Sequence, residues 1–348
     1  MTAVPLLSLL SSLVASSPAS RCEQIVLHRE KPLMSTYVGI TARGCDAGEL
    51  EGAIRAAFAE MERLSAQLSE WEPHSAVSQV SARAGVAPVV VPPALFTVLD
   101  VSQQVAALTG GAFDVTWAAL ADLWHFPATQ DSAPAPRLPA PAAVARQLAL
   151  VGYQNLDLDR GASTAYLRHP GMRLGLGGVA KGYIAAAAAD LLVSRGVADV
   201  LVAASGDLAA RGTNGPRPWT AAIEDPRRTG VVLATVELRD ESLSTAGDYE
   251  HCFFVAGHRY HHILDPKTGY PAEGAESVTV LSTSGALADA LDTGLLVLGT
   301  AHGTAAVAGL DVGALFVSAA GVVHAAGARA GRFALAPALA SPRADTRQ

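Results

Sequence analysis

Two carboxylates inside an otherwise apolar helical segment constrain this chain more than any other feature. Asp289, Asp292 and Thr293 lie in residues 286–298, and their spacing places three oxygen-bearing side chains on one helical face. The flanking residues are apolar, namely Leu287, Ala290, Leu291, Leu295 and Leu296. A buried carboxylate needs a cation, a donor or a metal ion to offset its desolvation. Such a face suits a hard cation such as Mg²⁺, and the alternative is a solvated acidic turn.

The composition indicates a globular chain with ample apolar material for its core. Of 348 residues, 50% are hydrophobic and 16% are charged, which fits one large α/β domain or two packed lobes. The formal net charge of −7 argues against a nucleic-acid-binding surface, which needs a basic excess. The three cysteines form no CxxC pair, so no disulfide framework is expected.

The N-terminus suggests targeting without settling it. Residues 1–21 contain a short apolar run and read as a possible signal peptide or a disordered leader, although no Lys or Arg precedes Arg21. The segment before Cys22 is a poor lipoprotein signal. Export and a mere frayed tail therefore both stay open. We expect one domain over residues 22–335, a flexible tail over 336–348, and no transmembrane helix.

Periodicity and capping residues predict the main elements. Helices are expected from Asp46 to Glu70–Trp71, from Pro92–Pro93 to Gly110–Gly111, over 181–195 and over 286–298. A proline-rich surface loop is expected over 127–142. Strands are expected at 31–42, 200–204, 219–223, 231–238, 252–256, 258–264, 277–281, 315–318 and 321–324.

Two glycine-rich segments are candidates for ligand binding. In the segment Thr109–Thr116, the Asp114 carboxylate can accept from a ligand N–H, or it can simply hold a buried turn. The segment Leu174–Tyr183 lacks both the GxGxxG and the Walker A spacing. Its backbone N–H groups at a helix start and the cation of Lys181 still suit a phosphate, and tight helix–strand packing is the alternative.

A histidine-rich stretch invites a zinc hypothesis that the spacing does not favour. His251, His258, His261 and His262 lie close together in the sequence. Neighbouring residues on a strand point to opposite faces, so His261 and His262 make a poor ligand pair.

The order and wording of these segments resemble the ApbE family of FAD:protein FMN transferases. The matching stretches span roughly residues 30–300: the Met34 strand, Glu70–Trp71 with Ser75, GGAFDVT with DLW, LGGVAKGY, STAGDYE, HHILDPKTGYP, SVTVLS and DALDTG. The resemblance implies a T-fold-like α/β (α+β) architecture. In it, two packed lobes hold mixed or antiparallel sheets flanked by helices.

The resemblance also implies a set of site residues. Flavin or cofactor contacts are expected from Met34, Trp71 (where tyrosine is common), Ala112, Phe113, Asp114, Gly175, Lys181, His262 and Ile263. Magnesium is expected on Gly178 through its carbonyl and on Asp289, Asp292 and Thr293. The family usually has Asp-Leu where this chain has Gly175–Leu176, so one contact on the adenosine or ribose side is lost or replaced.

The implied reaction is Mg²⁺-dependent transfer of FMN from FAD to a threonine or serine of another protein, with release of AMP. His262 and Asp292 are both candidates for the catalytic base. The alternatives are an FAD pyrophosphatase and an FAD-binding protein without transfer. In the family, acceptors are typically subunits of membrane electron-transport complexes, which fits a periplasmic or exported, possibly membrane-associated enzyme; a cytoplasmic one is the alternative.

Overall fold

An antiparallel sheet forms the centre of the molecule. The computed structural model describes residues 22–126, 137–249 and 251–336. Within these residues, eight strands pair in the order β1-β2-β6-β7-β10-β13-β14-β15, and every neighbouring pair is antiparallel. Their bounds are Ile25–Leu33, Thr36–Gly44, Asp199–Ala204, Asp207–Arg211, Ser242–Gly247, Ser277–Ser282, Gly313–Val317 and Val323–Ala326.

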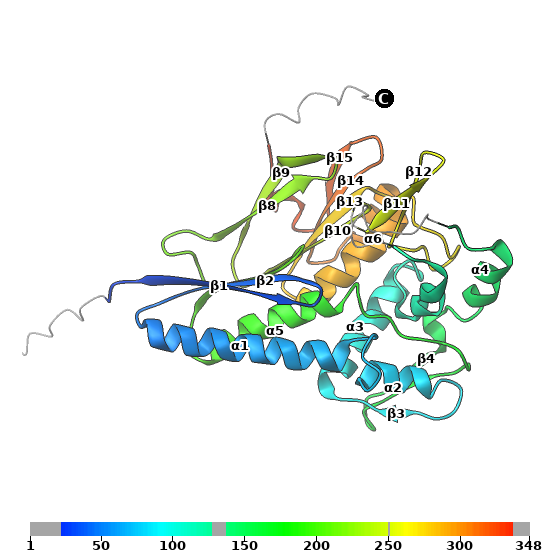
Figure 1. Ribbon diagram of the computed structural model, residues 1–348. Coiled ribbons are helices and arrows are strands. Elements are labelled where there is room, and N and C mark those ends of the chain that lie inside the picture. Colours follow the sequence, from blue (N-terminus) through cyan, green and yellow to red (C-terminus); the bar gives the residue numbers. More distant parts are fainter. Residues whose placement is uncertain (1–21, 127–136, 250, 337–348) are drawn as a thin grey trace, which may run out of the picture.

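Three helices cover one face of this sheet (Figure 1). They are α1 (Ala47–Leu68), α5 (Ala180–Ser194) and α6 (Gly285–Val307). Asp46 caps α1 by accepting from the N–H of Glu49 at 2.9 Å, and Ser284 caps α6 in the same way. The main apolar core lies between these helices and the sheet.

A smaller sheet covers part of the opposite face. Its strands are β8 (Trp219–Asp225), β9 (Arg228–Leu238) and β16 (Phe333–Leu335), in the order β16-β9-β8. Strand β8 alternates strictly between buried and exposed residues, as expected for a strand with one face in water. Strand β13 is buried at every position because both of its faces are covered.

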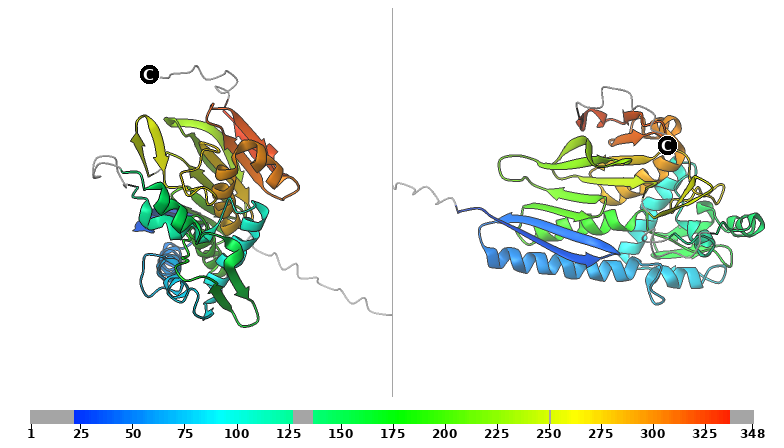
Figure 2. Two further views of the ribbon diagram at one scale, coloured as in Figure 1. Left: turned by 90° about the vertical axis from the view of Figure 1, so that its right-hand side faces the viewer. Right: turned by 45° about the horizontal axis from the view of Figure 1, so that its top comes forward.

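A second lobe packs beside the helix layer (Figure 2). It contains α2 (Ala76–Ala82), α3 (Pro93–Leu108), α4 (Pro141–Leu148), the 3₁₀ helices η1 (Val115–Leu123) and η3 (Tyr153–Asn155), and strands β3 (Val89–Val90), β4 (Leu156–Asp159) and β5 (Thr164–Leu167). The hairpin β11 (Cys252–Val255) and β12 (His258–His261) packs against it through an aromatic cluster. The mixed α/β architecture with antiparallel sheets agrees with the expected fold class.

The predicted strand over 31–42 is wrong in one respect, because a hairpin turn divides it. Met34 and Ser35 both adopt left-handed backbone conformations, with φ of 55° and 59°. They form the turn between β1 and β2, whose register pairs Leu33 with Thr36. Met-Ser carries no glycine or asparagine, so nothing in the local sequence marks the turn.

Other element predictions differ mainly at the boundaries. Helix α6 continues beyond residue 298 to Val307, with a non-helical Gly299 inside it. Strand β12 ends at His261 rather than residue 264. The residues of the predicted leader and most of the predicted tail, 1–21 and 337–348, lie outside the described residues. So does most of the proline-rich loop; its last residues, 141 and 142, begin α4.

The structure contains one disulfide that the sequence did not predict. Cys22 and Cys45 are bonded, with Cα atoms 5.7 Å apart, and they join the start of the described chain to the end of β2. Cys252 is buried and takes no part in this disulfide. None of the helices in the described part of the chain is both long and apolar enough to cross a membrane.

Candidate active site

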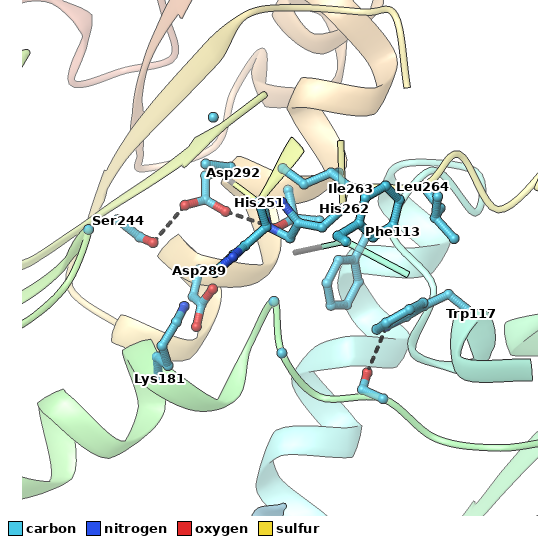
Figure 3. A pocket seen from close by; sticks show the side chains of 18 of the residues that line it. Phe113, Trp117, Lys181, Ser244, His251, His262, Ile263, Leu264, Asp289 and Asp292 are labelled. Carbon is cyan, nitrogen blue, oxygen red and sulfur yellow. Dashed lines mark hydrogen bonds between the residues drawn. The ribbon is translucent and has the colours of Figure 1, made fainter. Parts of the chain in front are cut away.

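A cavity of about 510 Å³ opens where the two lobes meet. Its lining comes from the residues just after α1, the segment 112–126, the glycine turn before α5, strand β10, the segment after β12 and the first turns of α6. Segments far apart in the sequence therefore converge on one site, which Figure 3 shows from close by.

The cavity collects almost every residue that the sequence predicted for the site. Met34 is the exception, because its side chain packs against the main core from the hairpin turn and its neighbour Ser35 lines the cavity instead. The predicted residues that line the cavity are Trp71, Ala112, Phe113, Asp114, Gly175, Gly178, Lys181, His262, Ile263, Asp289, Asp292 and Thr293.

One wall of the cavity is a cluster of buried carboxylates, defined here as the carboxylate cluster of Asp207, Asp289 and Asp292. All three residues are buried, with exposed fractions of 2% for Asp207, 3% for Asp289 and 2% for Asp292. The hydroxyl of Ser244 lies 2.7 Å from Oδ1 of Asp207 and 2.6 Å from Oδ2 of Asp292. The Lys181 ammonium donates to Oδ2 of Asp207 at 3.1 Å, and the N–H of Gly182 donates to Oδ2 of Asp289 at 2.8 Å.

The carboxylate cluster carries more negative charge than its one lysine balances. Burial, followed by the charge of Asp207, raises the pKa of Asp289 to about 7. Burial and the charges of Asp289 and Asp207 raise the pKa of Asp292 well above its ordinary value. Asp207, with the two other carboxylates, raises the pKa of Lys181 despite its burial, so this side chain stays a cation.

The glycine turn brings the backbone of residue 178 against α6. A Cβ added to Gly178 would lie 2.9 Å from Oγ1 of Thr293, so only glycine allows this approach. Oγ1 of Thr293 also donates to Oδ1 of Asp292 at 3.1 Å. The four predicted metal-binding residues therefore come together, although they belong to two separate segments of the chain.

The opposite wall is aromatic and glycine-rich. Phe113 and Trp117 point into the cavity from the segment that begins η1 (Figure 3). The indole N–H of Trp117 donates to the carbonyl of Gly175 at 3.2 Å. Trp71, which is 72% exposed, stands at the edge of the cavity and offers a free aromatic face.

Asp114 lines the cavity, but the protein itself already engages both of its oxygens. Oδ1 accepts from the N–H and the hydroxyl of Thr116 at 2.8 and 2.6 Å, and Oδ2 accepts from the N–H of Tyr153 at 2.7 Å. These bonds correspond to the alternative in which Asp114 holds a buried turn. Its contact with a flavin remains a prediction.

The histidines divide as the strand geometry predicted. His261 is buried and its Nε2 lies 2.8 Å from the carbonyl oxygen of Ala272, while burial lowers its pKa. His262 faces the cavity instead, with its ring 5.4 Å from that of His251 in an edge-to-face arrangement. Among the described residues, no group of three or more His, Cys, Asp or Glu side chains is placed to hold a metal ion.

The sequence reasoning missed several residues of the cavity. Asp207 and Ser244 complete the carboxylate cluster, and Glu70, whose pKa is raised by burial, lines the cavity next to Trp71. Ser244 stood in the STAGDYE segment already singled out, but the partners of both Asp207 and Ser244 lie far away in the sequence. Nothing in the local sequence pointed to Trp117 as a cavity residue, because its position depends on its contact with Gly175.

Comparison with known proteins points to a single family. A sequence model described as the ApbE family matches residues 34–316. The FAD:protein FMN transferases of Klebsiella pneumoniae and Treponema pallidum are 32% and 33% identical over 82% and 73% of this chain, and the matches cover 82% and 73% of those proteins. The crystal structure of the ApbE protein of Thermotoga maritima superposes with a TM-score of 0.77 at 29% identity, over 87% of this chain and 97% of that one. The flavinyl transferase ApbE of Pseudomonas stutzeri gives a TM-score of 0.76 at 29% identity, over 89% and 97%.

Proposed function

Because this chain belongs to the ApbE family, we propose that it transfers the FMN half of FAD to a threonine or serine hydroxyl of an acceptor protein and releases AMP. The observation that carries the proposal is the carboxylate cluster with Lys181 in a cavity that also presents aromatic faces. A flavin dinucleotide combines an aromatic ring with a charged pyrophosphate, so it needs both kinds of wall.

The residues present fit a divalent cation such as Mg²⁺. Asp289, Asp292, the Thr293 hydroxyl and the Gly178 carbonyl would hold it, a set of hard oxygen donors that Mg²⁺ prefers. The raised pKa values of Asp289 and Asp292 mark an excess of buried negative charge that such an ion would neutralise. When bound, such an ion would neutralise the negative charge that develops on the pyrophosphate oxygens.

The reaction exchanges a phosphoanhydride bond of FAD for a phosphate ester bond to the acceptor protein. The acceptor hydroxyl oxygen attacks the phosphorus of the FMN phosphate, and the bond from that phosphorus to the bridging oxygen breaks. The bridging oxygen keeps the electron pair and leaves as part of AMP. Lys181, held in place by Asp207, contributes a fixed positive charge beside the phosphates.

The proton of the acceptor hydroxyl passes to a base on the cavity wall. His262 and Asp292 both line the cavity. Asp292 already accepts from Ser244 and Thr293 and belongs to the metal-binding set, so we favour His262. A His262→Gln variant should lose transfer but keep Mg²⁺ binding. Loss of both would instead assign the histidine to the metal site.

Incubation with FAD, Mg²⁺ and a flavin-accepting protein, followed by in-gel flavin fluorescence, tests the proposal. Covalent flavin should appear with the wild type and disappear with Asp289→Ala and with Thr293→Ala, but persist with the exposed control Asp157→Ala. AMP release without covalent flavin would establish a pyrophosphatase. FAD binding without AMP release at millimolar Mg²⁺ would establish a binding protein.

We propose an exported, periplasmic location and an acceptor that is a subunit of a membrane electron-transport complex. The disulfide between Cys22 and Cys45 supports this, because disulfides persist mainly in oxidising compartments. A bonded Cys22 also has no thiol left for lipid attachment. Fractionation of cells with thiol labelling should find both cysteines protected in the periplasm. Free thiols in a cytoplasmic fraction would contradict the proposal.

A further inference from the structure

Trp117 forms part of the cavity wall and is locked to the neighbouring backbone. Its indole N–H donates to the carbonyl of Gly175 at 3.2 Å, and the N–H of Gly175 donates to the carbonyl of Val115 at 2.8 Å. The segment 115–117 and residue 175 are therefore joined by two hydrogen bonds, of which Figure 3 shows the one from the Trp117 indole. The indole plane is fixed before any ligand arrives.

Residue 175 cannot carry a side chain while the indole holds this position. A Cβ added to Gly175 would lie 2.9 Å from both Cε2 and Nε1 of Trp117 and 3.0 Å from Cβ of Ala118. Only glycine fits without moving the ring. The family resemblance would place an aspartate at position 175. Its side chain and the indole of Trp117 cannot both occupy this space.

This exchange changes the kind of contact that the wall offers. A carboxylate recognises a ligand through its hydrogen-bond donors, whereas the indole presents an apolar face and its single N–H is already bonded to Gly175. Stacking of an aromatic side chain on a nucleobase tolerates different bases, because every base has a π-face. The neighbouring lining residues Ala121 and Trp124 continue the apolar surface.

We propose that Trp117 is a specificity-determining residue for the leaving nucleotide, and that this chain holds the nucleobase of its flavin dinucleotide by stacking rather than through a polar contact from residue 175. The inference rests on the proposed function, since it takes a flavin dinucleotide as the substrate. The enzyme should accordingly accept more substrates than FAD alone, including flavin dinucleotides whose base is not adenine.

The contribution of the indole is separable from the chemistry. Trp117 has no hydrogen bond to the carboxylate cluster or to Lys181, and it stands on the wall opposite to them. Removal of the ring should therefore weaken ground-state binding, so that KM rises and kcat changes little.

The test compares Trp117→Val, Trp117→Phe and Gly175→Asp with the wild type in the full chain with Mg²⁺. Trp117→Val should raise KM for FAD by about tenfold, with kcat within about twofold, while Trp117→Phe should keep most of the affinity. Gly175→Asp should raise KM similarly because it displaces the indole. Phe96→Leu, on α3 with its ring beneath Arg160 and outside the cavity lining, is the control and should leave KM unchanged.

Two further measurements separate this inference from the proposed function. Calorimetric titration with AMP needs no transfer, and it should show the same loss of affinity in Trp117→Val. Flavin hypoxanthine dinucleotide should be bound by the wild type within about threefold of FAD. Equal AMP and FAD affinity in the wild type and Trp117→Val, or strong rejection of the hypoxanthine analogue, would overturn the inference. Ligand binding that depends on Trp117 without any transfer would refute only the proposed function.

Discussion

Two groups of buried carboxylates in this molecule are treated in opposite ways. Glu241, 5% exposed, is bonded to two arginines: Arg329 Nη1 lies 2.6 Å from Oε1 and Arg332 Nη2 lies 3.0 Å from Oε2. The carboxylate cluster places Asp207, Asp289 and Asp292 around the single cation of Lys181. Arg329 also pairs with the exposed Asp311, so that two arginines face two carboxylates in the first group. The first group is therefore charge-balanced within the protein, whereas the second is left negative.

The ion pairs of Glu241 have a structural role, whereas the uncompensated charge of the carboxylate cluster is typical of a ligand-binding site. Around Glu241 the charges join the start of β10 to the end of the described chain, and nothing further is needed. In the cavity, the buried carboxylates repel one another, and the cation proposed above would offset that repulsion. Four changes, taken from the largest expected effect to the smallest, test this contrast.

Asp292→Asn should reduce FMN transfer by about 10² to 10³-fold, because the loss of several kcal/mol of metal-dependent stabilisation translates into that range. Without metal the variant should be no less stable than the wild type, since the amide removes a buried like charge. Transfer assays and urea unfolding in EDTA measure the two effects. A variant that keeps more than a tenth of the wild-type transfer would remove Asp292 from the site.

Glu241→Gln should lower the free energy of unfolding by about 2 kcal/mol, because both arginines lose their shared partner while remaining partly in contact with water. Transfer per folded molecule should not change. Urea unfolding monitored by tryptophan fluorescence supplies the measurement. An unchanged urea midpoint would show that the ion pairs of Glu241 do not stabilise the protein, and would contradict the contrast with the carboxylate cluster.

Metal-free protein should lose stability as the pH rises through about 7. The folded pKa of Asp289, about 7, lies above its unfolded value, so the folded state binds more protons between these two pH values. The contribution of Asp289 to stability is thus greatest below its unfolded pKa and is lost as the pH rises to about 7. Unfolding in EDTA between pH 5.5 and 8 should show the decline, and millimolar Mg²⁺ should remove most of it. An identical pH dependence with and without Mg²⁺ would contradict a metal role for this carboxylate.

Ser244→Ala should have the smallest effect, about 1 kcal/mol of stability in EDTA at pH 8 and a less than tenfold loss of transfer. Its hydroxyl is the donor between Asp207 and Asp292. Ser242→Ala on the same strand is the matched control, because the Ser242 hydroxyl has no hydrogen-bond partner among the described residues. Similar losses in both variants would mean that the donor between the carboxylates is unimportant.

The elements that could be predicted from the sequence are those defined by local signals. Helix α3 begins at Pro93 and closes with glycines of positive φ at 110 and 111, as its capping residues predicted. The Met34–Ser35 turn and strand β10 escaped prediction for the same reason. Each depends on pairing with distant strands, which overrides weak local preferences.

The site shows the same division. Helical spacing alone pointed to Asp289, Asp292 and Thr293, and the glycine-rich helix start pointed to Lys181. The assignment of Gly178 came only from the family resemblance. Asp207 reaches them only through the pairing of β7 with β10, and the partnership of Trp117 with Gly175 exists only once the second lobe has packed. Periodicity contains no information about such contacts.

The crossing of α5 and α6 at Gly182 and Gly285 has a consequence for anyone who redesigns this scaffold. A Cβ on Gly182 would lie 2.8 Å from Cβ of Asp289 and against the Gly285 backbone, so no side chain fits there. A library that varies the aromatic wall of the cavity should change Trp117 and Gly175 together, because a side chain at residue 175 requires the indole to move. Gly182 and Gly285 must be kept as glycine, because they allow the close contact of α5 and α6 that positions Asp289.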